Sequence, residues 1–205
     1  MKYIFLGSKG KLQKNVSLGV PPRKAKGLKT VIGDNYIIRS GTVIYLGVKI
    51  GSGFQSGHNV LIREGNVMGN NTSIGTNSTI EPGNKIGDNV RIHSGCFLEN
   101  VTLGDNCFVG PNVVFTDDLH PICPSYQKCL GGAYVEDNVS IGANSTILPG
   151  VRIGRNSLIA AGALVHKDVP EGVVFGGSPG RVIKKIKALR CIKGFYKRPY
   201  IWREK

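Results

Sequence analysis

Aliphatic residues recur at every sixth position along most of this chain. Between Ile32 and Leu98, eleven of the twelve positions in this register are aliphatic, and only Ser56 departs from it. After a one-residue deletion the register resumes at Leu103, stops for an insertion of about 20 residues, and returns between Val135 and Val165. Gly-Asp-Asn and Gly-Ala-Asn runs separate the aliphatic positions and favour corners with positive φ. The pattern predicts short strands joined by tight turns.

Three such units are expected to close into one triangular coil. A strand of four or five residues with its turn uses about six residues, so a coil takes about 18 and stacks its aliphatic residues in interior columns. We predict an all-β fold, a parallel β-helix of about seven coils over residues 30–172 with an external loop at 116–134. The period alone leaves the handedness open. Residues 1–29 and 173–205 are expected to cap the two ends, with a short amphipathic C-terminal helix from Pro179 to Ile192.

Composition excludes a helical bundle, because 29 Gly and 10 Pro among 205 residues disfavour helix interiors. The net charge of +14 is concentrated at the ends. Residues 1–29 hold 8 Lys and Arg and no acid, residues 184–205 hold 9 against Glu204 alone, and the body between holds 10 basic and 12 acidic residues. The ends carry no recognisable nucleic-acid-reading module, so no nucleic acid partner is expected, and attraction of phosphate-bearing substrates explains them better.

Apolar runs and cysteines bear on the cellular compartment. No run approaches the ~18 apolar residues that cross a bilayer, and the N-terminal apolar stretch is too short for a signal peptide, so a cytoplasmic protein without a transmembrane segment is expected. The five cysteines are odd in number and form no CxxC pair, which favours reduced thiols. Cys96 and Cys107 fall on small inward positions and are expected to fill the core.

A family resemblance covers about residues 30–186. The run from Ile141 to Val165, followed by His-Lys-Asp-Val-Pro at 166–170 and Gly-Gly-Ser-Pro-Gly-Arg-Val-Ile at 176–183, resembles the C-terminal signature of the hexapeptide-repeat acyltransferases. This resemblance implies a left-handed β-helix, a homotrimer, and transfer of an acyl group from acetyl-CoA. It also implies active sites between adjacent subunits, with the insertion loop reaching across to the next one.

Within that family the chain is most similar to N-acetyltransferases of nucleotide-linked amino sugars, which serve polysaccharide biosynthesis. The segments that carry this resemblance are Phe115 to Pro121, Ser56 to Glu64 and His93 to Glu99. An alternative remains open, because His120 also falls where galactoside, maltose and xenobiotic O-acetyltransferases place their catalytic histidine. A non-catalytic β-helix scaffold is a third interpretation.

Acyl transfer from a thioester needs an acceptor held close to the carbonyl, a group that removes its proton, and donors for the developing oxyanion. His120 is our first candidate for the general base, because histidine titrates near neutral pH and this one lies in the long loop. Asp117 and Asp118 stand beside it and could orient the ring or bind a sugar hydroxyl. An amine acceptor needs such a base less than a hydroxyl does.

Counting in coils of 18 supplies the remaining acceptor-side candidates. His58 and His93 are expected on one face, two coils and about 10 Å apart. Glu64, Glu81 and Glu99 are expected to form an acidic ladder that needs a cation, for which a substrate ammonium, Arg63 or Arg91 would serve. His93 and Glu99 are the catalytic candidates of this group, since their coil precedes the loop. The substrate-binding candidates are His58, Glu64, Asn84, Ser94, Asp117 and Asp118.

The donor site is assigned by resemblance alone. The family resemblance implies that main-chain groups near Ala143 and Ala161 bind the pantetheine arm. It also implies that Lys167, Arg181 and Lys184 lie near the phosphates, which guanidinium and ammonium groups bind well. His166 departs from the threonine that is common at that position. No metal is expected, because His58 and His93 are too far apart along one chain to bind the same zinc ion.

Overall fold

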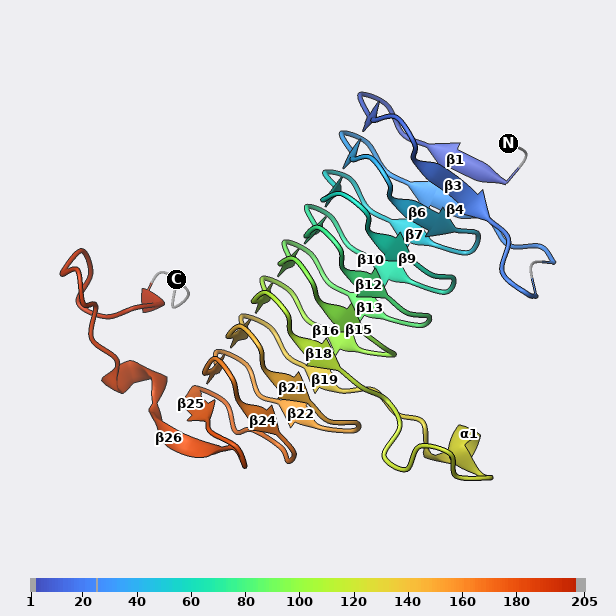
Figure 1. Ribbon diagram of the computed structural model, residues 1–205. Helices are drawn as coiled ribbons and strands as arrows, with labels where there is room; N and C mark the ends of the chain where they lie inside the picture. Colours follow the sequence, from blue (N-terminus) through green and yellow to red (C-terminus); the bar gives the residue numbers. More distant parts are fainter. Residues whose placement is uncertain (1–2, 25, 202–205) are drawn as a thin grey trace.

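The computed structural model describes residues 3–24 and 26–201 of the chain. Short strands wind into a column of stacked coils, and the strands of successive coils pair in parallel to form three sheets along the column (Figure 1). Each coil contributes one strand to each sheet. The predicted all-β fold is therefore confirmed, and β4 to β24 supply the seven coils that the period predicts.

The three sheets are named A, B and C in the order in which the chain enters them. Sheet A stacks β1 (Ile4–Leu6), β4 (Thr30–Ile32), β7 (Lys49–Ile50), β10 (Val67–Met68), β13 (Lys85–Ile86), β16 (Thr102–Leu103), β19 (Tyr134–Val135) and β22 (Arg152–Ile153). Sheet B stacks β2 (Lys11–Leu12), β5 (Ile37–Ile38), β8 (Gln55–Ser56), β11 (Ser73–Ile74), β14 (Arg91–Ile92), β17 (Phe108–Val109), β20 (Ser140–Ile141), β23 (Leu158–Ile159), β25 (Val173–Gly176) and β26 (Arg181–Lys185). Sheet C stacks β3 (Ser17–Val20), β6 (Val43–Tyr45), β9 (Leu61–Ile62), β12 (Thr79–Ile80), β15 (Phe97–Leu98), β18 (Val114–Phe115), β21 (Thr146–Ile147) and β24 (Leu164–Val165).

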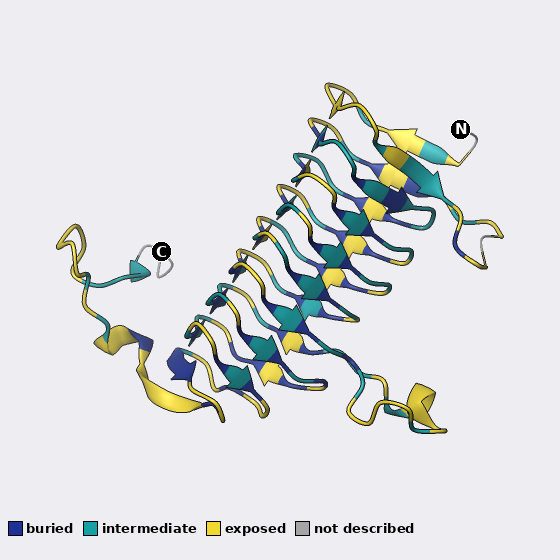
Figure 2. Ribbon diagram, in the orientation of Figure 1, coloured by how far each residue is buried: buried dark blue, intermediate teal, exposed yellow. Residues whose placement is uncertain are grey.

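The sixth-position residues fill the interior of the column. Ile80 pairs in register with Ile62 on one side and Leu98 on the other, and all three are fully buried. Their strand neighbours point outward, so buried and more exposed residues alternate along each coil (Figure 2). Residues with positive φ turn the corners, among them Asn59 at 54° and Gly53 at 77°. The repeat thus places one aliphatic side chain per face in a continuous core.

Ser56, the one polar residue in the aliphatic register, is buried without loss of hydrogen bonding. Its Oγ accepts from the Arg39 main-chain N–H at 2.9 Å and lies 3.1 Å from the Thr42 hydroxyl. Phe54, two residues earlier, is fully buried in the column of small residues and supplies the volume that Ser56 lacks. Cys96 and Cys107 are buried as predicted, and burial raises the pKa of the Cys96 thiol.

The N-terminal segment is built like the body. Strands β1, β2 and β3 pair in parallel with β4, β5 and β6, so residues 4–20 add one more coil to the column. Its strands are more exposed than those of later coils, with Phe5, Leu6 and Leu12 on the surface. This coil covers the core of the first predicted coil.

The insertion loop leaves the column at the corner between sheets C and A. It runs from β18 to β19 and contains the four-residue helix α1 (Tyr126–Cys129). The Gly131 N–H donates to the Asp117 carbonyl at 2.9 Å and closes the neck of the loop. One coil earlier the same corner is a residue shorter, and a Cβ on Gly132 would lie 1.7 Å from the Asn100 carbonyl oxygen. The one-residue deletion therefore accommodates the returning loop.

The C-terminal segment differs in part from its prediction. Strand β25 pairs in parallel with β23, and β26 then pairs antiparallel with β25 and extends sheet B beyond the last coil. A short helix is present, the 3₁₀ turn η1 (Ile186–Ala188), but the amphipathic helix expected from Pro179 to Ile192 is wrong. The open edge of sheet B offers the main-chain partners that this segment takes instead. Residues 202–205 of the tail lie outside the described residues.

Candidate active site

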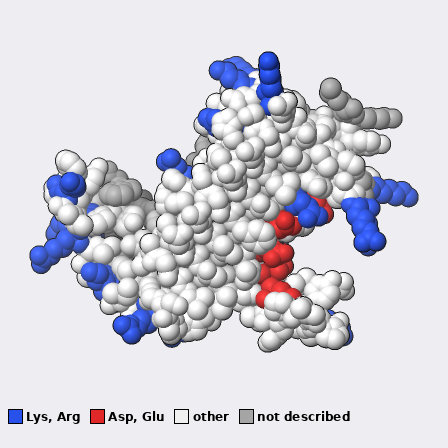
Figure 3. Space-filling model, in the orientation of Figure 1, with Lys and Arg blue, Asp and Glu red and all other residues white. Residues whose placement is uncertain are grey.

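Polar side chains gather at two of the three corners of the column. We name the first group, Arg63, Glu64, Glu81, Glu99 and Asp117, the carboxylate column; it lies at the corner between sheets C and A. We name the second the histidine groove; it lies at the corner between sheets B and C and includes His58 and His93. Figure 3 shows acidic side chains gathered in a band beside the loop.

The upper part of the carboxylate column is neutralised by an arginine. Strand pairing places Arg63, Glu81 and Glu99 at equivalent positions on three successive coils, directly after the paired core residues of sheet C. Arg63 bonds Glu64 and Glu81, each at 3.1 Å. The predicted ladder is thus corrected in one respect: Arg63 stands in register with the two glutamates, and Glu64 lies one residue farther along. Arg63 is also one of the cations that we expected to neutralise this acidic ladder.

Glu99 and Asp117 form the lower part of the column, where no ion pair to a Lys or Arg side chain of residues 3–24 or 26–201 is present. Burial, followed by the charge and hydrogen bond of Asp117 and the charges of Glu81 and Asp118, together raise the pKa of Glu99 to about 7. Asp117 is only 8% exposed. Glu99 in such a contact keeps its proton to higher pH, because ionisation beside a second carboxyl group is unfavourable. The pair therefore forms a site that a cationic group would stabilise.

His120 lies on the surface of the loop, close in sequence to this pair. Its main-chain N–H donates to Asp118 Oδ1 at 2.8 Å, so Asp118 fixes the backbone turn that carries the imidazole. The sequence left two roles open for the aspartates, orienting the ring or binding a sugar hydroxyl; in this chain Asp118 bonds the main chain, and Asp117 faces Glu99. The loop also exposes several large apolar side chains, Leu119, Ile122, Tyr126 and Leu130.

The histidine groove is a shallow cavity of about 330 Å³. His58, His93 and Ser94, all predicted for the acceptor side, line it together with Arg39 and Arg91. His58 Nδ1 lies 2.7 Å from the Ser40 hydroxyl. The His93 ring lies 4.9 Å from that of Phe108, and burial, with a smaller effect from the charge of Arg91, lowers the pKa of His93. His93 is thereby kept neutral and able to accept a proton.

The structure does not unite the two groups within one chain. His93 precedes strand β15 and Glu99 follows it, so they lie at opposite edges of sheet C. Sequence reasoning placed both on the acceptor side because they share a coil. It missed Arg39, whose signal was available: Arg39 stands at a register position that glycine occupies on the next two coils, Gly57 and Gly75.

Asn84 belongs to the scaffold. Its side chain is 0% exposed, and its Nδ2 donates to Asn66 Oδ1 at 2.9 Å and to the Glu81 carbonyl at 2.6 Å. Its Oδ1 accepts from the Val101 N–H at 2.8 Å. These bonds join three coils at one corner, so Asn84, predicted to bind substrate, is committed to the column's interior.

The residues predicted for the donor lie in the last coils. Lys167 and Arg181 line one cavity of about 680 Å³, together with the main chain of residues 176–180. Ala143 and Ala161 stack on adjacent coils, where the Gly162 N–H donates to the Ala143 carbonyl at 2.8 Å. Lys184 lies on β26 opposite Val174, outside the lining of that cavity. Two cations and exposed main chain fit a phosphate-bearing thioester.

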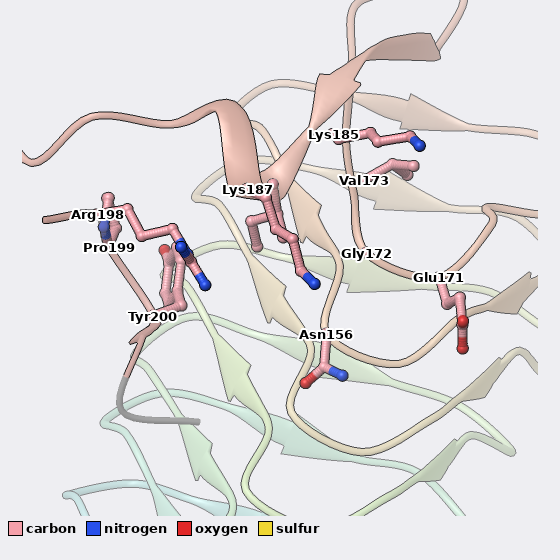
Figure 4. Close-up of a pocket in the computed structure, with 10 residues that line it drawn as sticks. Asn156, Glu171, Gly172, Val173, Lys185, Lys187, Arg198, Pro199 and Tyr200 are labelled. Carbon is pink, nitrogen blue, oxygen red and sulfur yellow. The ribbon is translucent and has the colours of Figure 1, made fainter. Parts of the chain in front are cut away.

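A second cavity lies at the other end of the β25 and β26 pair. It has a volume of about 420 Å³, and its lining includes Lys185, Lys187, Arg198, Tyr200 and Glu171 (Figure 4). The C-terminal tail folds back to form it. Figure 1 shows this tail and the insertion loop on opposite sides of the column, so the cavity is separate from His120.

Residues 3–24 and 26–201 contain no group of three or more His, Cys, Asp or Glu side chains placed to hold a metal ion. No helix within those residues has the length and apolar character needed to cross a membrane.

Comparison with known proteins identifies the family. The Bacterial transferase hexapeptide (six repeats) profile matches residues 85–117 and 132–167, and the Hexapeptide repeat of succinyl-transferase profile matches residues 65–100. The Saccharomyces cerevisiae protein YJL218W, which is assigned as an acetyltransferase, is 32% identical over 179 residues, covering 80% of this chain and 71% of that one. The chain belongs to the hexapeptide-repeat acetyltransferase family.

Two further likenesses define the extent of the relationship. The galactoside O-acetyltransferase of Lactococcus lactis is 44% identical over 93 residues, which are 42% of this chain and 44% of that protein. The match thus spans less than half the length of that relative. The crystal structure of LpxA, a UDP-N-acetylglucosamine acyltransferase from Bacteroides fragilis, superposes with a TM-score of 0.64 at 21% identity, covering 85% of this chain and 72% of that one. This likeness confirms the left-handed β-helix.

Proposed function

We propose that this protein transfers an acetyl group from acetyl-CoA to the amino group of a nucleotide-linked amino sugar. The observation that carries the proposal is the Glu99 and Asp117 pair at the neck of the loop in a hexapeptide-repeat acetyltransferase. The pKa of Glu99 is raised to about 7 beside Asp117, so its charged form is stabilised by a bound cation, and a sugar ammonium is such a cation. A hydroxyl acceptor would leave that charge uncompensated.

Donor binding is assigned to the last coils. Lys167 and Arg181 would hold the phosphates of acetyl-CoA, and the main chain near Ala143 and Ala161 would bond the pantetheine arm. Family membership supports acetyl-CoA as the donor, and the cavity beside the two cations supports this location. Lys184, on the outer strand β26, would act through long-range attraction only.

The chemistry requires the ammonium to lose one proton before nitrogen attacks. The proton passes to the Glu99 and Asp117 pair or to the imidazole of His120, and the neutral nitrogen then bonds the thioester carbonyl carbon. Collapse of the tetrahedral intermediate breaks the carbon–sulfur bond, and the departing thiolate takes the second proton from the attacking nitrogen, which leaves the amide and free coenzyme A. Positioning supplies most of the acceleration, because an unprotonated amine is already a good nucleophile.

A homotrimer with sites between subunits would bring the two corner groups together. Within one chain, His93 and Glu99 lie on opposite edges of sheet C. The exposed apolar side chains of the loop, Ile122 and Tyr126 among them, favour burial against another surface. We therefore propose that the loop carrying His120 packs against the histidine groove of a neighbouring subunit.

A thiol-release assay with acetyl-CoA tests the proposal. The acceptors are UDP-, dTDP- and GDP-linked amino sugars, with simple galactosides and maltose beside them. Turnover of a nucleotide-linked amino sugar is expected. Turnover of the free sugars alone would contradict the acceptor, and no turnover together with no coenzyme A binding would favour a non-catalytic scaffold.

An O-acetyltransferase of free sugars is the second candidate. The identity to a galactoside O-acetyltransferase and the His-Pro pair at 120 and 121 favour it. The variant His120→Ala separates the two, because a hydroxyl depends on its general base for a factor of about 10²–10⁴. With an amine acceptor we expect kcat to fall by about tenfold or less. A loss within the larger range would favour the hydroxyl acceptor.

A further inference from the structure

The histidine groove has a floor without side chains. Strand pairing aligns Arg39, Gly57, Gly75 and His93 at one position on four successive coils of sheet B. At the usual strand spacing, Arg39 and His93 are about 14 Å apart, with the two glycines between them. A Cβ on Gly57 would lie 2.3 Å from the Thr76 nitrogen, and one on Gly75 2.3 Å from the Ser94 nitrogen. The backbone packing therefore keeps this floor free of side chains.

Both sides of the floor carry groups that bind anions. One side is the outward column of Gln55, Ser73 and Arg91, and the other is the column of His58, Thr76 and Ser94. The described lining contains two arginines and two histidines and no carboxylate. This composition contrasts with the carboxylate column at the other edge of the same sheet, and it gives the groove a positive potential.

The arginines stand at the two ends of this floor. Arg39 donates from Nη1 to the Ser56 carbonyl, which anchors its guanidinium beside the groove, while Arg91 is exposed on the coil of His93. Guanidinium groups recognise phosphate oxygens through paired donors, and the hydroxyls of Ser73, Thr76 and Ser94 add further donors. The long side chains of Arg39 and Arg91 extend from the two ends toward the glycines, so a diphosphate lying over the glycines is within reach of both.

We infer that the histidine groove binds the diphosphate of the acceptor, with Arg39 and Arg91 as its principal ligands. This inference rests on the proposed function, and it names the part of the substrate that the groove recognises. Galactosides and maltose carry no such anion, so the groove selects nucleotide-linked sugars over free ones. The carboxylate column receives the amine, and the groove receives the phosphates.

Direct binding tests the groove without requiring turnover. Inorganic pyrophosphate is titrated into the full-length protein by calorimetry, and the His58 and His93 ring signals are followed by NMR. We expect wild type to bind and both histidine signals to shift, and Arg91→Gln and Arg39→Gln each to weaken binding by about tenfold or more, the value of one charge-assisted bond. Arg23→Gln removes an exposed arginine outside the groove and is expected to bind as wild type does. Equal binding by wild type and Arg91→Gln, or unshifted histidine signals, would overturn the inference.

Kinetics separate this inference from the proposed function. The acceptors are a nucleotide-linked amino sugar and the same amino sugar without its nucleotide. The groove variants are expected to lower kcat/KM for the first about tenfold and to lower it far less for the second, with melting temperatures like wild type. If the nucleotide-linked sugar is acetylated equally well by the variants, the groove assignment fails and the function stands. If pyrophosphate binding depends on the arginines but no amino sugar is acetylated, the function fails and the anion site stands.

Discussion

Two glutamates on neighbouring coils differ because of one arginine. Glu81 and Glu99 occupy equivalent positions, yet of these two Arg63 bonds Glu81, at 3.1 Å. Glu99 faces Asp117 instead, and burial and that second carboxyl raise its pKa to about 7. The ionisation of the glutamates at this corner therefore depends on which coil carries Arg63.

The raised pKa makes stability depend on pH. Between the ordinary value of 4.5 and about 7, folded Glu99 holds a proton that the unfolded chain releases, so the free energy of unfolding decreases as pH rises through this window. Glu99→Gln keeps the neutral form at every pH. We expect its melting temperature to exceed that of wild type by about 2–4 °C at pH 8, as ~1 kcal/mol does in a domain of this size, and to match it near pH 5.

Glu171→Gln is the control, because its carboxylate is exposed near the end of the column. It is expected to keep the wild-type dependence of melting temperature on pH. Parallel curves for wild type and Glu99→Gln between pH 5 and 8 would show that Glu99 does not hold this proton.

At the scale of elements, the repeat made most of the fold predictable. Each inward residue such as Ile80 meets its equivalents one coil above and below, so a period in sequence becomes a column in space. The C-terminal segment was harder, since its helical pattern competes with the open edge of sheet B, to which β26 pairs. That edge exists only once the column has formed.

The sequence predicted at which corners of the column the site residues lie, but not which side chains contact one another there. Face counting places His58 and His93 in one groove, as the structure does. It does not give the contact of Glu99 with Asp117, which depends on a shortened corner and on the loop neck, nor the burial of Asn84. Such contacts are set by corner geometry, which the six-residue period does not encode.

The buried asparagines form an element that can be tested separately. Asn84→Ala removes bonds to Asn66, the Glu81 carbonyl and the Val101 N–H, and leaves buried polar groups without partners. We expect the free energy of unfolding, measured in denaturant, to fall by about 2–4 kcal/mol. The folded variant is expected to keep its kcat/KM.

Asn70→Ala is the matched control, because Asn70 accepts from the Ser52 N–H at an exposed corner where water can replace it. Asn70→Ala is expected to lower the free energy of unfolding by less than about 1 kcal/mol. A change in acceptor KM for Asn84→Ala, with stability preserved, would return Asn84 to the substrate site.

At the scale of the whole molecule, assembly decides whether the two corner groups meet. Light scattering during gel filtration is expected to give a mass of about 66 kDa, which is three chains of 22.0 kDa. Tyr126→Ser on the exposed apolar face of the loop is expected to weaken that assembly and to lower activity most at low protein concentration. A fully active species of 22.0 kDa would exclude sites shared between subunits.

The bond formed in the product tests the central claim most directly. The protein is incubated with acetyl-CoA and a nucleotide-linked amino sugar that also carries free hydroxyls, and the acetylated product is treated with hydroxylamine before mass spectrometry. An N-acetyl group is an amide and survives, whereas an O-acetyl group is an ester and is removed. We predict a product that keeps its acetyl group; a product that loses it would contradict transfer to nitrogen and place the protein among the O-acetyltransferases.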